Sequence, residues 1–293
     1  MKKTRRRIFD RPDGKLLRKL SHNGKIIPFV MPRRVDSTNQ YNQNISIDNA
    51  EKVLKEVNEE HNLSAGIMDL VITAMVRTIS QMPKVNRFIV GKKIYARNDI
   101  SVSFAVKKDM NENSETTEVK IHFEPTDTLS DVSKKIRSVI VENKGDHAEN
   151  DQDVFTKILR YFPGFLITFI IGFIKFLDRL GIMPKFVYKI SPFHASFFLV
   201  NLGSLRIDSV YHHLYEIGTV SWFVGLGKKK SENIIQRDGS VKRRKYMEIR
   251  YSIDERITDG YYAANALRLM TKYMNNPKIL LDPPKEVVED NEI

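Results

Sequence analysis

The sequence contains no cysteine among its 293 residues. This absence excludes a disulfide scaffold, a thiolate metal site and a cysteine nucleophile, and it fits a reducing compartment such as the cytoplasm. Glycine and proline are sparse, at 14 and 11 residues, which argues against long low-complexity linkers. No long apolar run follows the basic N-terminus, so we expect no secretory signal peptide.

Positive charge is in surplus. Lysine and arginine total 48 against 36 aspartates and glutamates, which gives a net charge of +12. Such a surplus favours polyanionic partners, for example nucleic acid, anionic lipid or a phosphorylated cofactor. No zinc-finger, RNP or helix-turn-helix pattern accompanies it, so we interpret most of the charge as solvated surface and expect no nucleic-acid partner. The basic residues are densest in three clusters, Arg5-Arg6-Arg7, Lys228-Lys229-Lys230 and Lys242-Arg243-Arg244-Lys245.

Hydrophobic periodicity predicts a mixture of helices and strands. Hydrophobic residues make up 41% of the chain, enough for a sizeable core. Apolar residues at helical spacing predict helices near 48–61, 65–81 (with Ser64 as N-cap), 129–142 and 260–274. Apolar runs and alternation, with Gly91-Lys92 and Asp238-Gly239 as hairpin turns, predict strands near 87–90, 93–96, 101–106, 119–124, 196–200, 220–227 and 246–252. We therefore expect an α+β fold built on a mixed sheet.

Composition divides the chain into a main domain and shorter flanking segments. Residues 1–44 show no sustained period and are expected to form an irregular N-terminal arm. Residues 45–282 are expected to form the main domain, with an apolar helical insertion at about 145–192 that begins with a polar loop at 145–153. Residues 283–293 are expected to form a C-terminal tail.

One apolar segment needs a separate interpretation. Residues 161–174 carry no charge, but Pro163-Gly164 interrupts them early. Because a bilayer span needs about 20 residues, a buried helix, an oligomer interface or a membrane-surface element fits better than a span. We expect the segment to be largely buried in a protein that needs no detergent, and a peripheral membrane contact through 158–177 stays open.

The most informative motif lies near the C-terminus, since P-loop, GxSxG and HExxH patterns are absent. It reads Ile253-Asp254-Glu255-Arg256-Ile257-Thr258-Asp259-Gly260 and leads directly into the last predicted helix. This segment resembles the C-terminal signature of the acyltransferase domains of 2-oxo acid dehydrogenase complexes and of chloramphenicol acetyltransferase. That signature is His-x-x-x-Asp-Gly, usually preceded by Asp, with Arg after the histidine.

Other segments resemble this family in the same order along the chain. They are Val85-Asn86-Arg87-Phe88, Asn98-Asp99-Ile100-Ser101-Val102-Ser103-Phe104-Ala105-Val106, Phe198-Leu199-Val200-Asn201-Leu202-Gly203 and Phe223-Val224-Gly225-Leu226-Gly227. The likeness covers roughly 40–282 except 145–192. It implies a two-layer sandwich of a mixed sheet with helices on one side, assembled as homotrimers with the active site in a channel between subunits.

The resemblance implies acyl transfer between coenzyme A and a thiol or hydroxyl, with a histidine as base and a hydroxyl of the neighbouring subunit stabilising the oxyanion. By position, the histidine falls at Glu255 and the serine at Val200, so neither chemical group is present. Asp259 and Gly260 match the motif, and the family's aspartate is mainly structural and pairs with an arginine. The residues that hold the fold are kept, whereas the two that do the chemistry are replaced.

Three interpretations follow. Glu255 is the base if desolvation raises its pKa from about 4.3 toward neutrality. Alternatively, the base comes from His212-His213, which lie between two of the family-like strands, in a segment that borders the channel in the family; a backbone N–H, Asn201 or a protonated histidine then stabilises the oxyanion. In the third interpretation the chain is a catalytically silent trimeric binding or assembly scaffold.

The favoured prediction is a CoA-dependent acyltransferase with an atypical active site made from His212, His213, Glu255, Asp259 and Asn201. The resemblance implies acyl-CoA as a substrate and a small-molecule or acyl-carrier acceptor. We expect no metal, and no lipoyl group on this chain, because it lacks the lipoyl domain and its Asp-Lys-Ala motif. We expect a cytoplasmic homotrimer.

Overall fold

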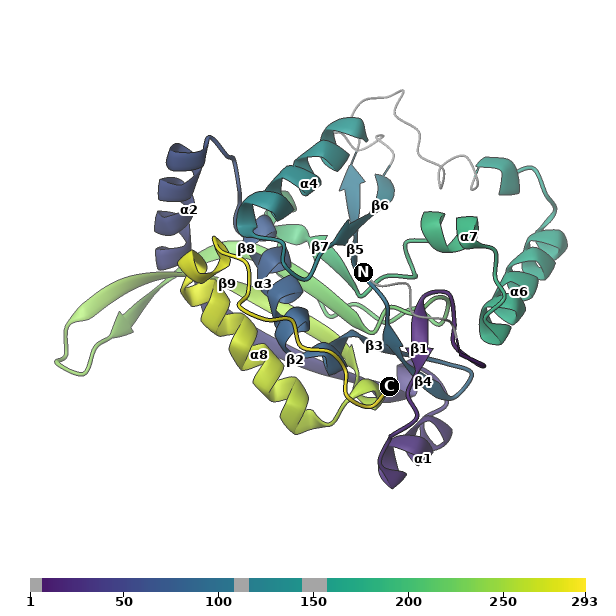
Figure 1. The fold of residues 1–293 in the computed structure, drawn as a ribbon. Helices are drawn as coiled ribbons and strands as arrows, with labels where there is room; N and C mark the ends of the chain where they lie inside the picture. Colours follow the sequence, from purple (N-terminus) through teal and green to yellow (C-terminus); the bar gives the residue numbers. More distant parts are fainter. Residues whose placement is uncertain (1–6, 108–115, 144–156) are drawn as a thin grey trace.

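The computed structural model describes residues 7–107, 116–143 and 157–293. Its strands form a six-stranded sheet of order β2-β9-β8-β7-β5-β6 and a three-stranded sheet of order β1-β4-β3 (Figure 1). In the larger sheet β7 runs parallel to β5 and β8, and the other neighbours are antiparallel, so the sheet is mixed. The strands are β1 Gly14–Leu16, β2 Thr38–Ser46, β3 Arg87–Val90, β4 Lys93–Arg97, β5 Ile100–Lys107, β6 Thr116–Phe123, β7 Phe197–Asn201, β8 Trp222–Ile235 and β9 Val241–Asp254.

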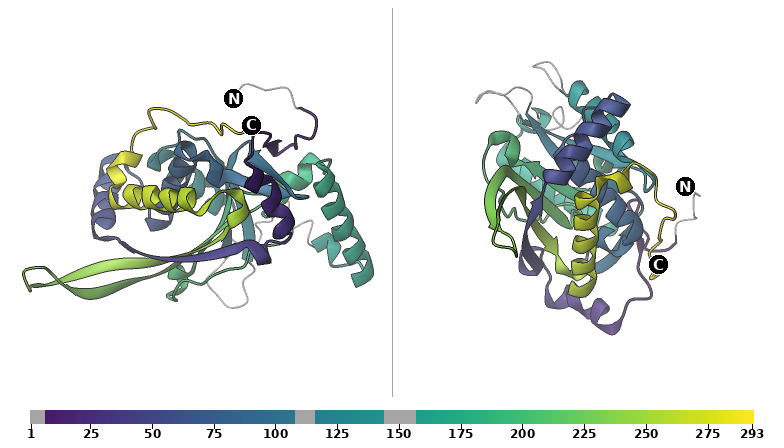
Figure 2. Two further views of the ribbon diagram at one scale, coloured as in Figure 1. Left: turned by 90° about the horizontal axis from the view of Figure 1, so that it is seen from below. Right: turned by 90° about the vertical axis from the view of Figure 1, so that its left-hand side faces the viewer.

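Helices pack on one face of the six-stranded sheet, which confirms the predicted α+β fold class (Figure 2). Strand residues of one parity, such as Leu199, Val224 and Tyr251, meet α3, α4 and α8 in a single core. The α-helices are α1 His22–Val30, α2 Asp48–His61, α3 Ile67–Gln81, α4 Leu129–Glu142, α6 Gly164–Leu180, α7 Lys185–Ile190 and α8 Gly260–Asn275. Short 3-10 turns are η1 Val35–Ser37, η2 Pro83–Asn86, η3 Leu202–Leu205, η4 Glu255–Ile257 and η5 Pro277–Leu280.

Local sequence signals explain most element boundaries. The β3–β4 hairpin turns at Gly91 and Lys92 with φ of 57° and 64°, the left-handed backbone that a tight two-residue hairpin needs. Helix α3 begins after Gly66 rather than after Ser64, because the Asp69 carboxylate accepts a hydrogen bond from the Gly66 N–H at 2.6 Å.

The opposite face of the sheet is covered by the segment between η3 and β8. A Cβ added to Gly225 would lie 2.7 Å from the carbonyl oxygen of Val210, so the glycine lets this segment approach the strand closely. The contact buries a small second cluster that includes Phe198, Leu214 and Phe223. This face carries the candidate site.

The N-terminal arm is more ordered than predicted. The described part of 1–44 contains β1, α1 and most of β2, where the sequence analysis expects irregular backbone. Strand β2 pairs with β9 along its whole length, from Thr38 opposite Asp254 to Ser46 opposite Tyr246. The prediction of irregular backbone is wrong here because β2 is a mainly polar edge strand without the apolar alternation that indicates a strand.

The expectation that the apolar segment is largely buried is also wrong. It forms α6, in which Asp178 is the one buried residue. Phe165 and Phe169 are 77% and 68% exposed, and Phe173, Phe176 and Leu180 continue the same exposed face. Figures 1 and 2 show α6 standing out from the body of the protein. Apolar composition indicates that a helix packs against other apolar groups, but it does not indicate whether those groups belong to the same chain. The loop predicted at 145–153 lies outside the described residues.

No helix in the described ranges is both long enough and apolar enough to cross a bilayer.

Candidate functional site

The turn that carries the signature motif is fixed by a buried ion-pair cluster. Asp254 is fully buried at the end of β9 and accepts two hydrogen bonds from the guanidinium of Arg256, at 2.8 Å from Nε and 2.7 Å from Nη2. Arg34 Nε lies 4.0 Å from the same carboxylate, and the Ser37 hydroxyl donates to it at 3.2 Å. A bidentate pair inside the protein holds the chain in one geometry, so the next residue, Glu255, is presented in a defined place.

Glu255 and Asp259 lie at the surface around this turn. The Glu255 carboxylate accepts a hydrogen bond from Asn39 Nδ2 of β2 at 2.5 Å and is exposed. Asp259 caps α8, since its carboxylate accepts a hydrogen bond from the Tyr262 N–H at 2.9 Å. The arginine pairing that the resemblance implies for Asp259 is made instead by Asp254, and Asp259 has a capping role.

The two adjacent histidines lie on the opposite face of the sheet from the helices. The ring of His212 is stacked on Phe223 of β8, with centroids 3.9 Å apart and planes 6° apart, and His213 stacks on His212 at 4.4 Å. Tyr215 lies edge-on to His213 at 4.9 Å. This aromatic packing fixes the orientation of both rings.

Hydrogen bonding defines the tautomer of His212. Its Nδ1 lies 2.9 Å from the carbonyl oxygen of His213, and a carbonyl only accepts, so Nδ1 carries the hydrogen in the neutral ring. Nε2 then has the lone pair and has no hydrogen-bond partner among the described residues. Burial lowers the pKa of His212 below its ordinary value, although the hydrogen bond to the His213 carbonyl opposes this shift. His212 is therefore neutral near pH 7 and able to accept a proton.

Strand register shows how far apart the candidate residues are. Phe223, which supports His212, pairs with Ser252 of β9, and Glu255 follows three residues later, just past the end of that strand. At 3.4 Å per residue this separation is about 10 Å. Val200 pairs with Gly225, which pairs with Arg250, five residues before Glu255 and about 17 Å away by the same rise. Within one chain, the histidines lie between the positions of Val200 and Glu255.

Asn201 is not brought to the histidines. It pairs with Leu226, three residues beyond Phe223, which corresponds to about 10 Å. Its Nδ2 lies 3.8 Å from the sulfur of Met68, a weak acceptor, and the side chain is exposed at the end of β7. Val200, just before it, is half-buried against the same small cluster as Phe223.

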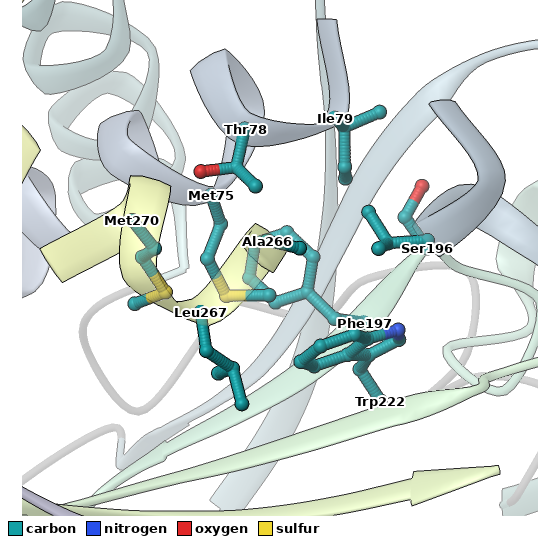
Figure 3. A pocket seen from close by; sticks show the side chains of 10 residues that line it. Met75, Thr78, Ile79, Ser196, Phe197, Trp222, Ala266, Leu267 and Met270 are labelled. Carbon is teal, nitrogen blue, oxygen red and sulfur yellow. The ribbon is translucent and has the colours of Figure 1, made fainter. Parts of the chain in front are cut away.

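A small, mainly apolar void lies between the sheet and α3 and α8 (Figure 3). Its volume is about 10 Å³, close to the minimum for one water, and it is lined by residues such as Met75, Phe197 and Met270. This void is a packing gap and cannot hold a substrate. Within the ranges that the structure describes, no group of three or more His, Asp or Glu side chains is placed to hold a metal ion.

The fold is one that solved proteins share. A mixed six-stranded sheet with helices on one face is shared with solved acyltransferases. The computed structure matches a probable dihydrolipoamide acetyltransferase from Listeria monocytogenes 4b F2365 with a TM-score of 0.55 and 14% identity, over 89% of this chain and 95% of that one. It matches chloramphenicol acetyltransferase with a TM-score of 0.51 and 12% identity, over 89% and 99%.

A third solved structure is dihydrolipoamide acetyltransferase from Azotobacter vinelandii, with a TM-score of 0.56, 12% identity and coverage of 83% and 84%. That structure belongs to investigations on the role of a serine, a histidine and an asparagine four positions after that histidine in the catalytic mechanism of the enzyme. At these identities the likeness shows the fold alone.

The family model of the 2-oxoacid dehydrogenases acyltransferase (catalytic domain) matches residues 36–113 and 194–281, more than half of the chain. The chain belongs to this family. No curated protein matches it in sequence. The match leaves out the N-terminal arm up to residue 35 and the stretch from 114 to 193 that contains α6 and α7.

Sequence reasoning found the signature turn and the histidine pair but missed their supports. Asn39, which holds Glu255, lies in a strand without an apolar pattern. Phe223, on which His212 stacks, belongs to one of the segments that resemble the family. Nothing in the sequence indicates which side chain stacks on it. The Asp before Glu255 and the Arg after it were the one local signal for the buried pair of Asp254 and Arg256.

Proposed function

We propose that the chain is a CoA-dependent acyltransferase in which His212 is the general base. The observation that carries this proposal is the hydrogen bond from His212 Nδ1 to the His213 carbonyl, which leaves Nε2 as the proton acceptor. Its stacking on Phe223 holds the ring on the sheet face that also carries Val200, the position of the family's serine.

The reaction follows from this assignment. Nε2 takes the proton of the acceptor thiol or hydroxyl, whose sulfur or oxygen attacks the thioester carbon of acyl-CoA. The carbon–sulfur bond to CoA then breaks, and the CoA thiolate takes the proton back from the imidazolium. His213 or a backbone N–H stabilises the oxyanion, because Val200 has no donor and Asn201 lies about 10 Å along the strand from the histidines.

Glu255 is not the general base in this proposal. It is exposed and already held by Asn39, whereas a carboxylate base needs desolvation to raise its pKa.

Glu255 and Val200 are about 17 Å apart along the strands, so a site that uses both positions takes them from two copies. We therefore also propose a homotrimer, whose mass light scattering measures; a monomer at micromolar concentration would contradict it.

The test compares His212→Ala, His213→Ala and Glu255→Gln by free CoA release with a panel of thiol and hydroxyl acceptors. Loss of a general base costs roughly 100-fold or more, and we expect this for His212→Ala. His61→Ala, on the surface of α2, is the matched control and should keep full activity. Loss of turnover in Glu255→Gln alone would make Glu255 the base.

A catalytically silent scaffold of the same fold is the second candidate. It is favoured by the replacement of both family groups, with glutamate at 255 and valine at 200. A wild-type protein that releases no CoA with any acceptor would support the scaffold. The acceptor, a small molecule or an acyl carrier, and the cytoplasmic location are further parts of the proposal; the location rests on the absence of cysteine.

A peripheral membrane contact through 158–177 completes the proposal. The exposed phenylalanines of α6 form one apolar face, and the charged residues from 157 to 190 are six cations and one acid, Asp178, which is buried. An apolar helix face beside cations suits an anionic bilayer surface better than a second, equally basic copy of the chain. Flotation with anionic and zwitterionic vesicles tests this contact.

A further inference from the structure

We propose that a second cavity, between β6, α7 and the N-terminal arm, binds the phosphate group of a small molecule. The cavity has a volume of about 360 Å³, within the range of small-ligand sites. Its lining residues are Pro12, Asp13, Arg97, Asn98, Asp99, Lys120, His122, Lys185, Tyr188, Lys189 and His194. This inference is independent of the proposed acyl transfer.

The cavity lies away from Glu255 and the signature turn. It is at the β5–β6 edge of the six-stranded sheet, whereas Glu255 and Asn39 lie at the β9–β2 edge, the other end of the strand order. Seven of its eleven lining residues fall outside the ranges that match the family. The cavity is therefore formed mainly by residues outside the family match.

Its charges select an anion. Four cations line it, and the structure gives none of Arg97, Lys120, Lys185 and Lys189 a carboxylate within 4.0 Å among the described residues. The two acids of the lining are already engaged. Asp13 pairs with Arg11 at 2.9 Å, and Asp99 pairs with His122 at 2.8 Å. The lining thus holds four cations against two acids, and a phosphate monoester, with a charge of about −2, matches that surplus of two.

The two inner cations are held in place by other contacts. The Lys120 ammonium donates to the carbonyl oxygens of Tyr188, Ser191 (3.0 Å) and His194 (3.4 Å), which fixes it at the end of α7. Burial lowers the pKa of Lys120 to about 8, although the charge of Asp99 opposes this shift, and the nearby Arg97 lowers the pKa further. A bound anion would stabilise the charged form of both cations.

Arg97 has unused donors in this cavity. Its Nη2 donates to the carbonyl and hydroxyl of Thr219 at 2.8 and 2.9 Å, and its guanidinium lies 4.5 Å from the centre of the Phe88 ring. Its Nε is buried without a hydrogen-bond partner, and no described residue accepts from Nη1. A planar guanidinium with free donors, fixed at one end, is suited to a phosphate oxygen.

Calorimetry on the full chain tests the proposal with inorganic phosphate and glycerol 3-phosphate. Lys185 and Lys189 are exposed, so the double variant K185A/K189A should fold, which circular dichroism checks. We expect saturable binding that this variant weakens about tenfold. The control K242A/K272A removes two exposed cations elsewhere and should bind like the wild type. The ring signals of His122 and His194, but not His61, should move in NMR spectra.

Monomeric dihexanoyl phosphatidic acid distinguishes the source of the phosphate. Tighter binding than glycerol 3-phosphate would identify a lipid headgroup, and equal or weaker binding would identify a soluble phosphate ester. No saturable binding of any of the three probes, or equal binding by the wild type and K185A/K189A, would overturn the proposal. The same loss in K242A/K272A would also overturn it, because the binding would then follow net charge alone.

Discussion

The imidazole of His212 lies flat on the phenyl ring of Phe223, with 3.9 Å between the ring centres and 6° between the planes. Phe223 belongs to a central strand and is itself stacked on Phe198 of the next strand at 5.1 Å. The histidine is thus placed by the sheet, although it belongs to a segment without regular structure. Phe223→Ala should lower transfer in the same assay without changing which residue is the base.

The pH dependence of transfer should show the lowered pKa of His212. We expect kcat/KM to rise with pH to a plateau, with an apparent pKa below the ordinary histidine value of about 6.5. The unfolded imidazole binds protons at higher pH than the folded one, so this group's contribution to stability falls as pH falls through that window. A rate that keeps rising above pH 8 would point to a different base.

Removing the exposed aromatic face should abolish membrane binding without unfolding the protein. The double variant F169S/F173S changes two side chains that are more than half exposed, so its stability should stay within about 0.5 kcal/mol of the wild type. Vesicle flotation should drop to background. Tyr261→Ser removes an equally exposed aromatic from α8 and should float like the wild type. If F169S/F173S instead dissociates an oligomer, the face is a contact between copies.

Two glycines with nearly the same positive φ should respond differently to alanine. Gly218 and Gly239 have φ of 81° and 83°. An added Cβ at Gly218 would lie 2.1 Å from the Phe193 carbonyl oxygen, whereas at Gly239 it meets nothing within 4 Å. Gly239→Ala should cost about 1 kcal/mol from backbone strain alone, and Gly218→Ala at least about 3. Urea denaturation measures the loss of unfolding free energy in both variants. Equal losses would contradict the steric clash expected at Gly218.

The ion pair between Arg11 and Asp178 should contribute far more stability than an exposed pair. Arg11 Nη2 donates to Asp178 at 2.6 Å with both side chains nearly covered. Burial pushes the pKa of Asp178 upward, but His194 and Arg11 hold it well below its ordinary value, so its contribution is lost as pH falls below about 4. Asp178→Asn should cost about 3 kcal/mol, against less than about 1 for Asp36→Asn in the exposed pair with Arg33. Guanidinium denaturation compares them.

Much of the fold was predictable because its signals are local. Helices α2 and α8 follow their apolar stripes, and the Gly91-Lys92 turn defines the β3–β4 hairpin. The motif residues placed the β9–α8 turn through Asp254 and Arg256. Strand β2 was missed because its pairing with β9 is made by backbone groups between positions some 200 residues apart, which its own side chains do not reveal.

The candidate site was only partly predictable for a related reason. The adjacent histidines are visible in the sequence, but their environment depends on contacts across strands. Whether His212 is a base depends on the His213 carbonyl and on Phe223, and neither contact has a sequence signature. The exposure of α6 was predicted wrongly because a stretch of Phe and Ile has the same composition whether it packs in the protein core, against a second copy of the chain or on a lipid surface.

The contact of Arg11 with Asp178 joins two parts of the chain that the family match leaves out, the N-terminal arm and the helix α6. Each supplies one charge of a buried pair, so shortening the arm takes Arg11 away from Asp178, and removing α6 leaves Arg11 with Asp13 alone. The arm and α6 therefore depend on each other. A chimera that grafts α6 onto a family member without these segments must include the N-terminal arm as well.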